Sequence, residues 1–330
     1  MRISITDDGS GILKKFAKAI SAVVHGRFVH IPEKRGEGYL TGFNWGNDLR
    51  MMIRNFHLKD DIYIDRTNEL AEGTEDVIFM LSGIFPSPGN QPEEMLAEQG
   101  TVLICMHKVS ATMAMPSNTM FGNLTLAVSR QYLRQLFGAI KHPVVETILN
   151  GNDQFVYETG LSAAMIRTGI EMLDQQIPEM IESHFYKIKC EELLCYTFAL
   201  LLQREASPTS NLHLDDIKAI YAVKSRLQSC LNEPPNIASL ARESGIGEAK
   251  LRKLFKQTFG RGVFKYYQTA RMQEAARLLL KDSLTVSEAG YRLGFSNLSH
   301  FSRVFEQYIG VKPKKYIMGH RNSPGPPRPA

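Results

Sequence analysis

The residues whose types and spacing point most clearly to a chemical role lie near the end of this 330-residue chain, in a stretch that occurs twice. The sequence IASLARESGI at 237–246 is followed by LRKLFKQTFG at 251–260. Its counterpart VSEAGYRLGF at 286–295 is followed by FSRVFEQYIG at 301–310. Each later run is amphipathic. The first carries Arg252, Lys253 and Lys256 and the second carries Arg303, and such basic side chains suit contact with a polyanion.

Each copy has the residue order of a helix-turn-helix. Ala241 and Gly290 are small residues where two helices must cross closely, and Gly245 and Gly294 suit the positive φ of a sharp turn. The other shared positions are an apolar plug and a terminal glycine, at Ile246, Phe295, Gly260 and Gly310. The pattern predicts two such units, joined by a helix over residues 263–282.

Local signals also predict how these helices begin and which side chains they bury. Thr285 and Glu288 have the spacing of a capping box at the start of the second unit. Ser296 or Asn297 is expected to cap the later helix of that unit. Four apolar residues are expected to face the core and not a ligand: Leu251, Phe255, Phe301 and Phe305.

Charged residues are distributed unequally along the chain, and the repeats lie in its basic part. Residues 213–321 contain 19 Lys and Arg against 9 Asp and Glu, whereas residues 1–212 contain 19 against 25. A basic third joined to an acidic remainder suggests that only one part meets a polyanion.

The basic part resembles the DNA-binding domain of the AraC/XylS family of transcription regulators. The resemblance covers about 215–318, and LTVSEAGYRLGFSNLSHFSRVFEQYIGVKPKKY follows the family signature almost position for position. The sequence departs from the family at Gly247, where a serine or threonine cap is usual. It also has Arg261-Gly262-Val263 in place of x-Ser-Pro, and Gly290 in place of alanine. The resemblance implies promoter DNA as the partner, with both later helices entering successive major-groove faces.

The motif positions of the family imply which side chains contact DNA. Base contacts fall on Ala249, Arg252, Lys253, Leu298, Ser299, Ser302 and Arg303. Arg252 and Arg303 suit bidentate contact with guanine, whereas Ala249 and Leu298 offer apolar contact to thymine methyl groups. Phosphate contacts are expected from Lys250, Lys256, Lys312, Lys314 and Lys315. We expect the second unit to supply most of the recognisable signature and the first to tune the target sequence.

The spacing of apolar residues along the rest of the chain predicts an α+β fold. Short apolar runs between turn signals from 28 to 128 predict a small, cupin-like β-sandwich or barrel, and helical spacing from 130 to 205 predicts helices. Residues 1–27 are interpreted as a helix or a flexible lead-in. The predicted divisions are a β-rich sensing domain at 1–128, a helical coupling or dimerisation region at 129–206, a linker at 207–212, an all-α domain with two helix-turn-helix units at 213–318 and a disordered tail at 319–330.

The N-terminal part resembles a subgroup of the same family. Residues 30–62 are similar to regulators of pyochelin-type siderophore uptake. This resemblance implies a small-molecule effector such as a ferric siderophore, and an activator of iron-uptake genes. Candidate ligand-lining residues are Tyr39, Trp45 and Arg54.

The sequence also allows two other functions for the N-terminal domain. The N-terminal domain could only dimerise, or it could be a cupin-like enzyme fused to a DNA-binding domain. The sequence shows no catalytic motif, no histidine cluster of the cupin type and no cofactor fingerprint, so neither catalytic residues nor a cofactor are predicted. Residues 105–120 are rich in soft ligands for Cu(I), although methionines filling a buried strand explain them as well, and no metal is predicted.

The sequence also indicates the protein's partners and its location in the cell. A transcription regulator implies RNA polymerase as a partner, and an apolar helix face with Ile188, Leu194, Phe198 and Leu201 serves either a homodimer or intramolecular packing. No run of 18 uncharged apolar residues occurs, so no membrane span is expected. The four cysteines form no CxxC pair, which fits the cytoplasm.

Overall fold

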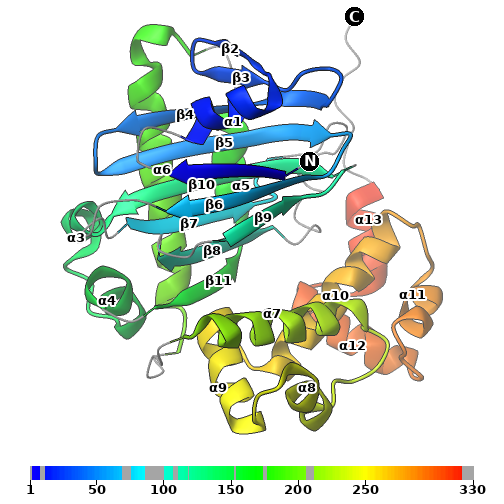
Figure 1. Cartoon of the computed structure of the whole chain (residues 1–330). Coiled ribbons are helices and arrows are strands. Elements are labelled where there is room, and N and C mark those ends of the chain that lie inside the picture. The colour runs from blue at the N-terminus through cyan, green and yellow to red at the C-terminus, as the bar shows by residue number, and fades with distance from the viewer. Residues whose placement is uncertain are drawn as a thin grey trace, which may run out of the picture. The chain divides into compact units, whose positions relative to one another are not determined.

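The protein forms two compact units, 1–212 and 213–330, which are described separately (Figure 1). The computed structural model describes residues 2–7, 12–68, 76–85, 100–106, 111–117, 119–151, 154–173, 177–205 and 212–321. The predicted linker at 207–212 lies outside these residues except for Leu212. That residue is buried, and its amide donates to the carbonyl oxygen of Gln154 at 3.2 Å.

The N-terminal unit is built on an eight-stranded antiparallel sheet. In order of pairing, its strands are β11 (Val156–Gly160), β8 (Thr101–Met106), β7 (Asp76–Ser82), β10 (Met120–Ser129), β5 (Leu49–Leu58), β4 (Gly36–Trp45), β3 (Phe28–His30) and β2 (Val23–His25). A second sheet holds β1 (Arg2–Asp7), β6 (Ile62–Asn68) and β9 (Ala111–Met115), with β1 parallel to β6. The predicted α+β class, with a β-rich N-terminal domain, is confirmed.

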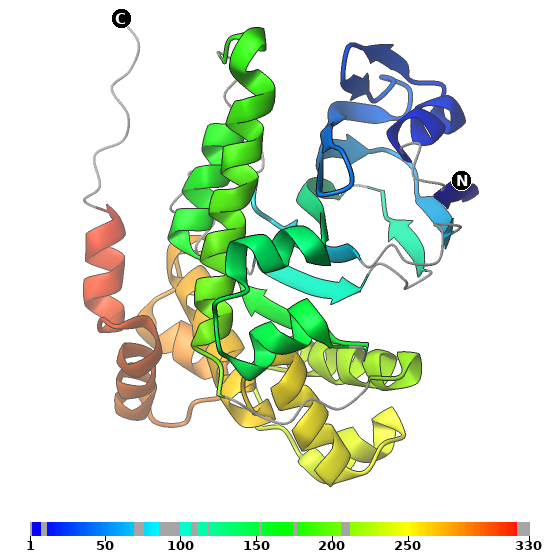
Figure 2. The same cartoon turned by 90° about the vertical axis from the view of Figure 1, so that its left-hand side faces the viewer.

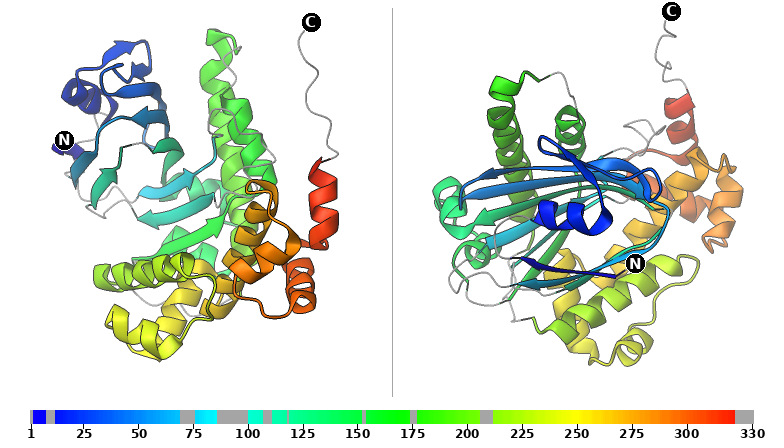
Figure 3. Two further views of the ribbon diagram at one scale, coloured as in Figure 1. Left: turned by 90° about the vertical axis from the view of Figure 1, so that its right-hand side faces the viewer. Right: turned by 45° about the horizontal axis from the view of Figure 1, so that its top comes forward.

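Helix α1 (Ile12–Ile20) covers one face of the large sheet (Figure 3, right). Its residues Phe16 and Ile20 are buried with Leu40 and Phe56 of the large sheet and with Ile62 of the small sheet. Residues 2–7 and 23–25 are strands, so the prediction of only a helix or flexible lead-in over 1–27 is wrong there. Their pairing partners β6 and β3 lie elsewhere in the sequence, and no local pattern reveals such partners.

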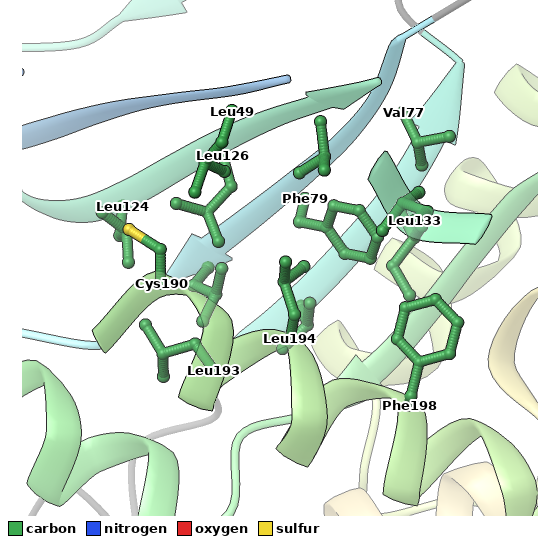
Figure 4. Packing of buried hydrophobic residues seen from close by; sticks show 14 of the residues in the cluster. Leu49, Val77, Phe79, Leu124, Leu126, Leu133, Cys190, Leu193, Leu194 and Phe198 are labelled. Atoms are coloured by element: carbon green, nitrogen blue, oxygen red, sulfur yellow. The ribbon is translucent and has the colours of Figure 1, made fainter. Parts of the chain in front are cut away.

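Four helices cover the opposite face of the large sheet, and α5 and α6 lie side by side on it (Figure 2). They are α3 (Arg130–Phe137), α4 (Pro143–Asn150), α5 (Ala163–Met172) and α6 (Glu179–Leu202). Leu124 and Leu126 alternate along β10 to meet Leu194 and Phe198 of α6 in this core (Figure 4). Phe198 also stacks on Phe137 at 4.0 Å between ring centroids.

One prediction for this region is corrected. Residues 156–160 form β11, although the interval from 130 to 205 was expected to be wholly helical. The strand pairs with β8, with Val156 opposite Cys105, so a distant segment decides its conformation. Among the described residues, no helix is both long and apolar enough to cross a membrane.

The C-terminal unit consists of seven helices within its described residues, 213–321 (Figure 3, left). They are α7 (Leu214–Ser229), α8 (Ile237–Ser244), α9 (Glu248–Phe259), α10 (Val263–Leu280), α11 (Val286–Arg292), α12 (Leu298–Ile309) and α13 (Pro313–Arg321). Helix α10 packs against α7, α9, α11, α12 and α13, and so forms the centre of this unit. Helix α13 continues to Arg321, beyond the predicted start of a disordered tail at 319, and residues 322–330 lie outside the described part.

Candidate nucleic-acid interface

The first repeat folds into two helices joined at Gly245. Asn236 caps α8 by accepting a hydrogen bond from the Ser239 amide at 3.0 Å. Gly245 has φ of 71°, the left-handed conformation predicted for this turn, and no atom crowds the position where a Cβ would lie. Helix α9 follows Gly247, which provides no side-chain cap. Ile246, the predicted plug, is only half-buried.

The second repeat is held by more local contacts than the first. The capping box predicted from Thr285 and Glu288 is confirmed: the Thr285 amide donates to Glu288 Oε2 at 2.8 Å, and the Glu288 amide donates to Thr285 Oγ1 at 3.2 Å. The Thr285 hydroxyl, which donates to Glu288 Oε2 at 2.7 Å, and the Thr285 amide together hold the pKa of the Glu288 carboxyl below its ordinary value. Of the two predicted caps for α12, Asn297 is the one used, since its side chain accepts from the amides of Ser299 and His300 at 2.9 and 3.0 Å.

Gly294, in the turn of the second unit, is required on two grounds. Its φ is 77°, which disfavours any residue with a Cβ. A Cβ would also lie 1.9 Å from the carbonyl oxygen of Asn232, in the segment between α7 and α8. The turn of the second unit is therefore packed directly against the segment that leads from α7 into the first unit.

Gly290 explains one departure from the family pattern. An added Cβ at this position would lie 2.8 Å from Leu298 Cδ2 and 3.3 Å from Phe301 Cδ1. The side chain of Leu298 is folded back toward α11 and is half-buried. Leu298 therefore offers less surface to a DNA base than its motif position implies.

The predicted core residues of both later helices are confirmed. Leu251, Phe255, Phe301 and Phe305 are each fully buried. Phe301 and Phe305 pack in one cluster with Met272 and Leu279 of α10, and the ring of Phe255 contacts that of Phe259 at a tilt, with 4.5 Å between centroids. Since these residues fix the inner faces of α9 and α12, the polar side chains between them point outward.

Arg271 of α10 fixes the turn of the second unit, and sequence reasoning missed it. It is buried, and its Nε and Nη2 donate to the carbonyl oxygen of Leu293 at 3.0 and 2.5 Å. Its guanidinium lies 3.8 Å above the ring of Phe295. Burial lowers the pKa of this guanidinium. The available signal was its place four residues from both Tyr267 and Ala275, on the buried side of α10.

The base-contact candidates lie mostly on the outer faces of α9 and α12. Five of the seven are exposed and Leu298 and Ser302 are half-buried; the exposed ones are Ala249, Arg252, Lys253, Ser299 and Arg303. Within the part of the chain that the structure describes, Arg252 pairs with Glu248, one helical turn earlier, at 3.3 Å. Arg303 Nη2 lies 3.3 Å from Nδ1 of His300. Such exposed neighbours hold an arginine weakly, so both can turn toward a ligand.

The phosphate-contact candidates differ in their surroundings. Lys312, Lys314 and Lys315 are exposed around the start of α13, and Lys256 is half-buried on α9. Lys250 Nζ lies 2.7 Å from the buried carboxylate of Asp216 in α7. This ion pair ties the first turn of α9 to α7, where Gly247 gives no cap.

The three ligand candidates of the N-terminal unit do not converge. Tyr39 and Trp45 pack toward the core beneath α6. Arg54 stands opposite Leu40 in the β4–β5 pairing and faces the other side of the sheet, where its Nη1 donates to Thr125 Oγ1 at 2.7 Å.

The soft-ligand segment at 105–120 lies only partly within the described residues, since His107 and the side chain of Met113 fall outside them. Within the described ranges, no group of three or more His, Cys, Asp or Glu side chains is arranged to hold a metal ion.

Comparison with known proteins agrees with this geometry. Residues 240–318 match the sequence model of a family described as "Helix-turn-helix domain". This stretch is a helix-turn-helix domain. It contains α9 to α12 and most of α8 and α13, and therefore both repeats.

Three curated relatives share part of the sequence. The HTH-type transcriptional regulator GlxA of Rhizobium meliloti is 30% identical over 95 residues, which are 29% of each chain. The regulatory protein PchR of Pseudomonas aeruginosa is 34% identical over 90 residues, 27% of this chain and 30% of the relative. The multiple antibiotic resistance protein MarA of Escherichia coli is 25% identical over 103 residues, 31% of this chain and 81% of MarA.

These matches support the resemblance to AraC/XylS regulators and a role in DNA binding. The chain spans less than a third of the length of GlxA and of PchR.

Proposed function

We propose that this protein is a sequence-specific transcription regulator that reads DNA with α9 and α12. The observation that carries this proposal is the pair of helix-turn-helix units held on one central helix, α10, each with an exposed polar face on its later helix. Two such units on one rigid core can enter successive major-groove faces of a single DNA segment.

Within this interface the side chains divide into two roles. Arg252 and Arg303 read guanine, with Lys253, Ser299 and Ser302 beside them. Ala249 meets a thymine methyl group, and Leu298 does so only with the part of its side chain that stays exposed beside α11. Lysines at positions 250, 256, 312, 314 and 315 neutralise phosphates and add affinity without sequence preference. The contact of Lys250 with Asp216 gives that lysine a second task, because it also positions α9.

Selection of bound DNA from a random pool tests the proposal. The full chain is expected to enrich one sequence with two conserved halves. Failure to enrich any sequence, at a salt concentration where the protein still binds DNA, would refute a sequence-specific role.

The N-terminal unit is proposed to sense a small molecule, with residues 1–128 as the sensor and 129–206 as the coupling region. A ferric siderophore is the proposed effector, and activation of iron-uptake genes with RNA polymerase in the cytoplasm is the proposed output. The resemblance of residues 30–62 to siderophore regulators supports this part.

A panel of ferric siderophores tests this part of the proposal. One member of the panel is expected to raise the thermal stability of the protein. Absence of stabilisation by every compound and by cell extract would favour the alternative, an N-terminal unit that only dimerises.

A homodimer through α6 is proposed on an outward stripe that shares only Ile188 with the predicted apolar face. Leu194, Phe198 and Leu201 are buried within the unit. The outward stripe contains Ile181, Ile188, Cys195 and Leu202, spaced seven residues apart, and all four are exposed. In an antiparallel pair of α6 helices, Ile181 would meet Leu202 and Ile188 would meet Cys195, which satisfies two-fold symmetry.

Sedimentation of the full chain tests this interface. The variant Ile188→Glu should shift the dimer to monomer, whereas His184→Glu, on the same face, should have a smaller effect. A monomeric wild type would exclude the interface.

A further inference from the structure

A second chemical cluster lies in the N-terminal unit, on the face of the large sheet that carries α6. Its centre is Arg27, in the turn between β2 and β3. The Arg27 guanidinium lies 4.2 Å from the ring centroid of Phe28, 4.8 Å from that of Phe43 and 5.0 Å from that of Tyr186. All three distances are within the range in which an aromatic face attracts a cation.

Two polar groups complete the surroundings of Arg27. Its Nη1 donates to Oγ1 of the buried Thr41 at 2.6 Å. Its Nε donates to Glu182 Oε2 at 3.2 Å, and Nη2 pairs with the other carboxylate oxygen of Glu182. This two-point pairing is the geometry with which arginine recognises a carboxylate. Glu182 belongs to the first turns of α6, so the ion pair fastens the start of that helix to the β2–β3 hairpin.

The cluster is reachable from solvent. The side chains of Arg27 and Glu182 retain 18% and 22% of their exposure. Phe28, Tyr39, Phe43 and Trp45 form a row of half-buried rings beside them. Phe43 and Trp45 stack at 5.4 Å between ring centroids, and Phe28 and Tyr39 meet edge to face at 5.4 Å. A flat aromatic ring with an anionic group fits such surroundings, because the ring can stack while the anion pairs with the arginine.

We propose that the Arg27 cluster is a binding site for an aromatic carboxylate or phenolate, whose anionic group replaces Glu182 on Arg27. This inference rests on the proposed sensing role and names the class of ligand that the N-terminal unit takes. The side chains of Arg27 and Glu182 keep about a fifth of their exposure, so an anion that also stacks on the neighbouring rings can compete with Glu182 for the same two donors of Arg27.

Displacement of Glu182 would release only the start of α6. Residues 179–181 are exposed, and the buried contacts of this helix begin at Tyr186, whose hydroxyl donates to the carbonyl oxygen of Met172 at 2.9 Å. The first turns can therefore move while the core under Leu193 and Leu194 stays closed. Ile181, at the end of the outward stripe of α6, would move with them.

The fluorescence of a tryptophan beside Glu182 can report the displacement of the Glu182 carboxylate. Trp45 is the single tryptophan, and its Nε1 donates to Ser183 Oγ, next to Glu182, at 3.0 Å. Titration of the full chain with benzoate should therefore change the tryptophan fluorescence in a saturable way. Acetate lacks the ring and benzamide lacks the charge, so both should give little or no change.

Variants separate the proposed contacts. Glu182→Gln removes the competing carboxylate and should bind benzoate several-fold more tightly than the wild type. Glu179→Gln, an exposed carboxylate on the same helix, should leave the affinity unchanged. Arg27→Gln should abolish binding, and Arg27→Lys, which keeps the charge without the two-point fork, should weaken it. Saturable binding that survives Arg27→Gln, or no binding to either the wild type or Glu182→Gln, would overturn the site.

Failure of this site and failure of the proposed function give different results. DNA binding at a selected sequence, measured with and without benzoate, should change in the wild type and not in Arg27→Gln. Benzoate binding with unchanged DNA affinity would overturn the link to sensing. Loss of sequence-specific DNA binding in every sample would instead refute the proposed function.

Discussion

Single exposed arginines carry the sequence preference proposed for this protein. Arg252 and Arg303 occupy corresponding outer faces of α9 and α12, while the buried Leu251 and Phe301 beside them hold those helices in place. A guanidinium can meet both acceptors on the major-groove edge of guanine, whereas a lysine at the phosphate backbone meets the same charge at every base pair. The two kinds of residue should therefore be separable by experiment.

Arg303→Ala is expected to reduce the discrimination between the selected DNA and a scrambled sequence by about 1–3 kcal/mol, because one bidentate pairing with guanine is removed. Lys314→Ala is the matched control: it should weaken binding to both sequences alike and reduce the slope of the salt dependence by about one. Binding titrations at several salt concentrations measure both effects. Equal weakening on both sequences for Arg303→Ala would contradict its role in base reading.

Arg271→Met is expected to loosen the turn of the second unit, although Arg271 lies away from the proposed DNA face. The change keeps most of the side-chain volume but removes both donors to the Leu293 carbonyl oxygen. Leaving that acceptor without its partner costs about 1–3 kcal/mol. Amide hydrogen exchange across α11 and α12 should accelerate accordingly, while Arg242→Met, on the exposed side of α8, should not change it. Unchanged exchange in Arg271→Met would show that the turn does not depend on this contact.

At the scale of elements, the second helix-turn-helix unit is better fixed than the first. It has a capping box, a doubly accepting Asn297 and a turn glycine packed against Asn232. The first unit has an uncapped α9 and relies on the pair formed by Lys250 and Asp216. This contrast is consistent with the expectation that the second unit supplies most of the recognisable signature.

Gly290→Ala is expected to destabilise the second unit, even though the family usually has alanine there. The new Cβ would meet Leu298 Cδ2 at 2.8 Å, and such overpacking costs about 1–3 kcal/mol. The double variant Gly290→Ala with Leu298→Ala should recover much of this stability, because the obstructing atom is gone. Hydrogen exchange of α11 and α12 measures each variant. A double variant no more stable than the single one would place the cause elsewhere.

Local signals predicted much of the C-terminal unit. The capping box at Thr285, the positive φ at Gly245 and the burial of Phe305 each follow from neighbours within a few residues. The features that sequence missed depend on distant partners. Strand β11 is set by β8, Arg271 meets a carbonyl 22 residues later, and Arg27 pairs with Glu182, 155 residues away. No periodicity encodes such contacts, because only the folded chain brings these residues together.

At the scale of the whole molecule, charge and fold divide at the same place. The basic residues 213–321 form the all-helical unit, and the acidic residues 1–212 form the unit built on two sheets. Positive charge on one unit attracts a polyanion such as DNA to that unit. The three relatives each match less than a third of this chain.

The proposed function depends on α9 and α12 reading one DNA segment together. The most direct test compares binding to the selected DNA with binding to the same DNA after about five base pairs, half a helical turn, are inserted between its two halves. Two recognition helices on one core predict a decrease of at least about tenfold in affinity, because the halves then face opposite sides of the duplex. Equal affinity for both DNAs would contradict joint reading and would show that a single unit binds.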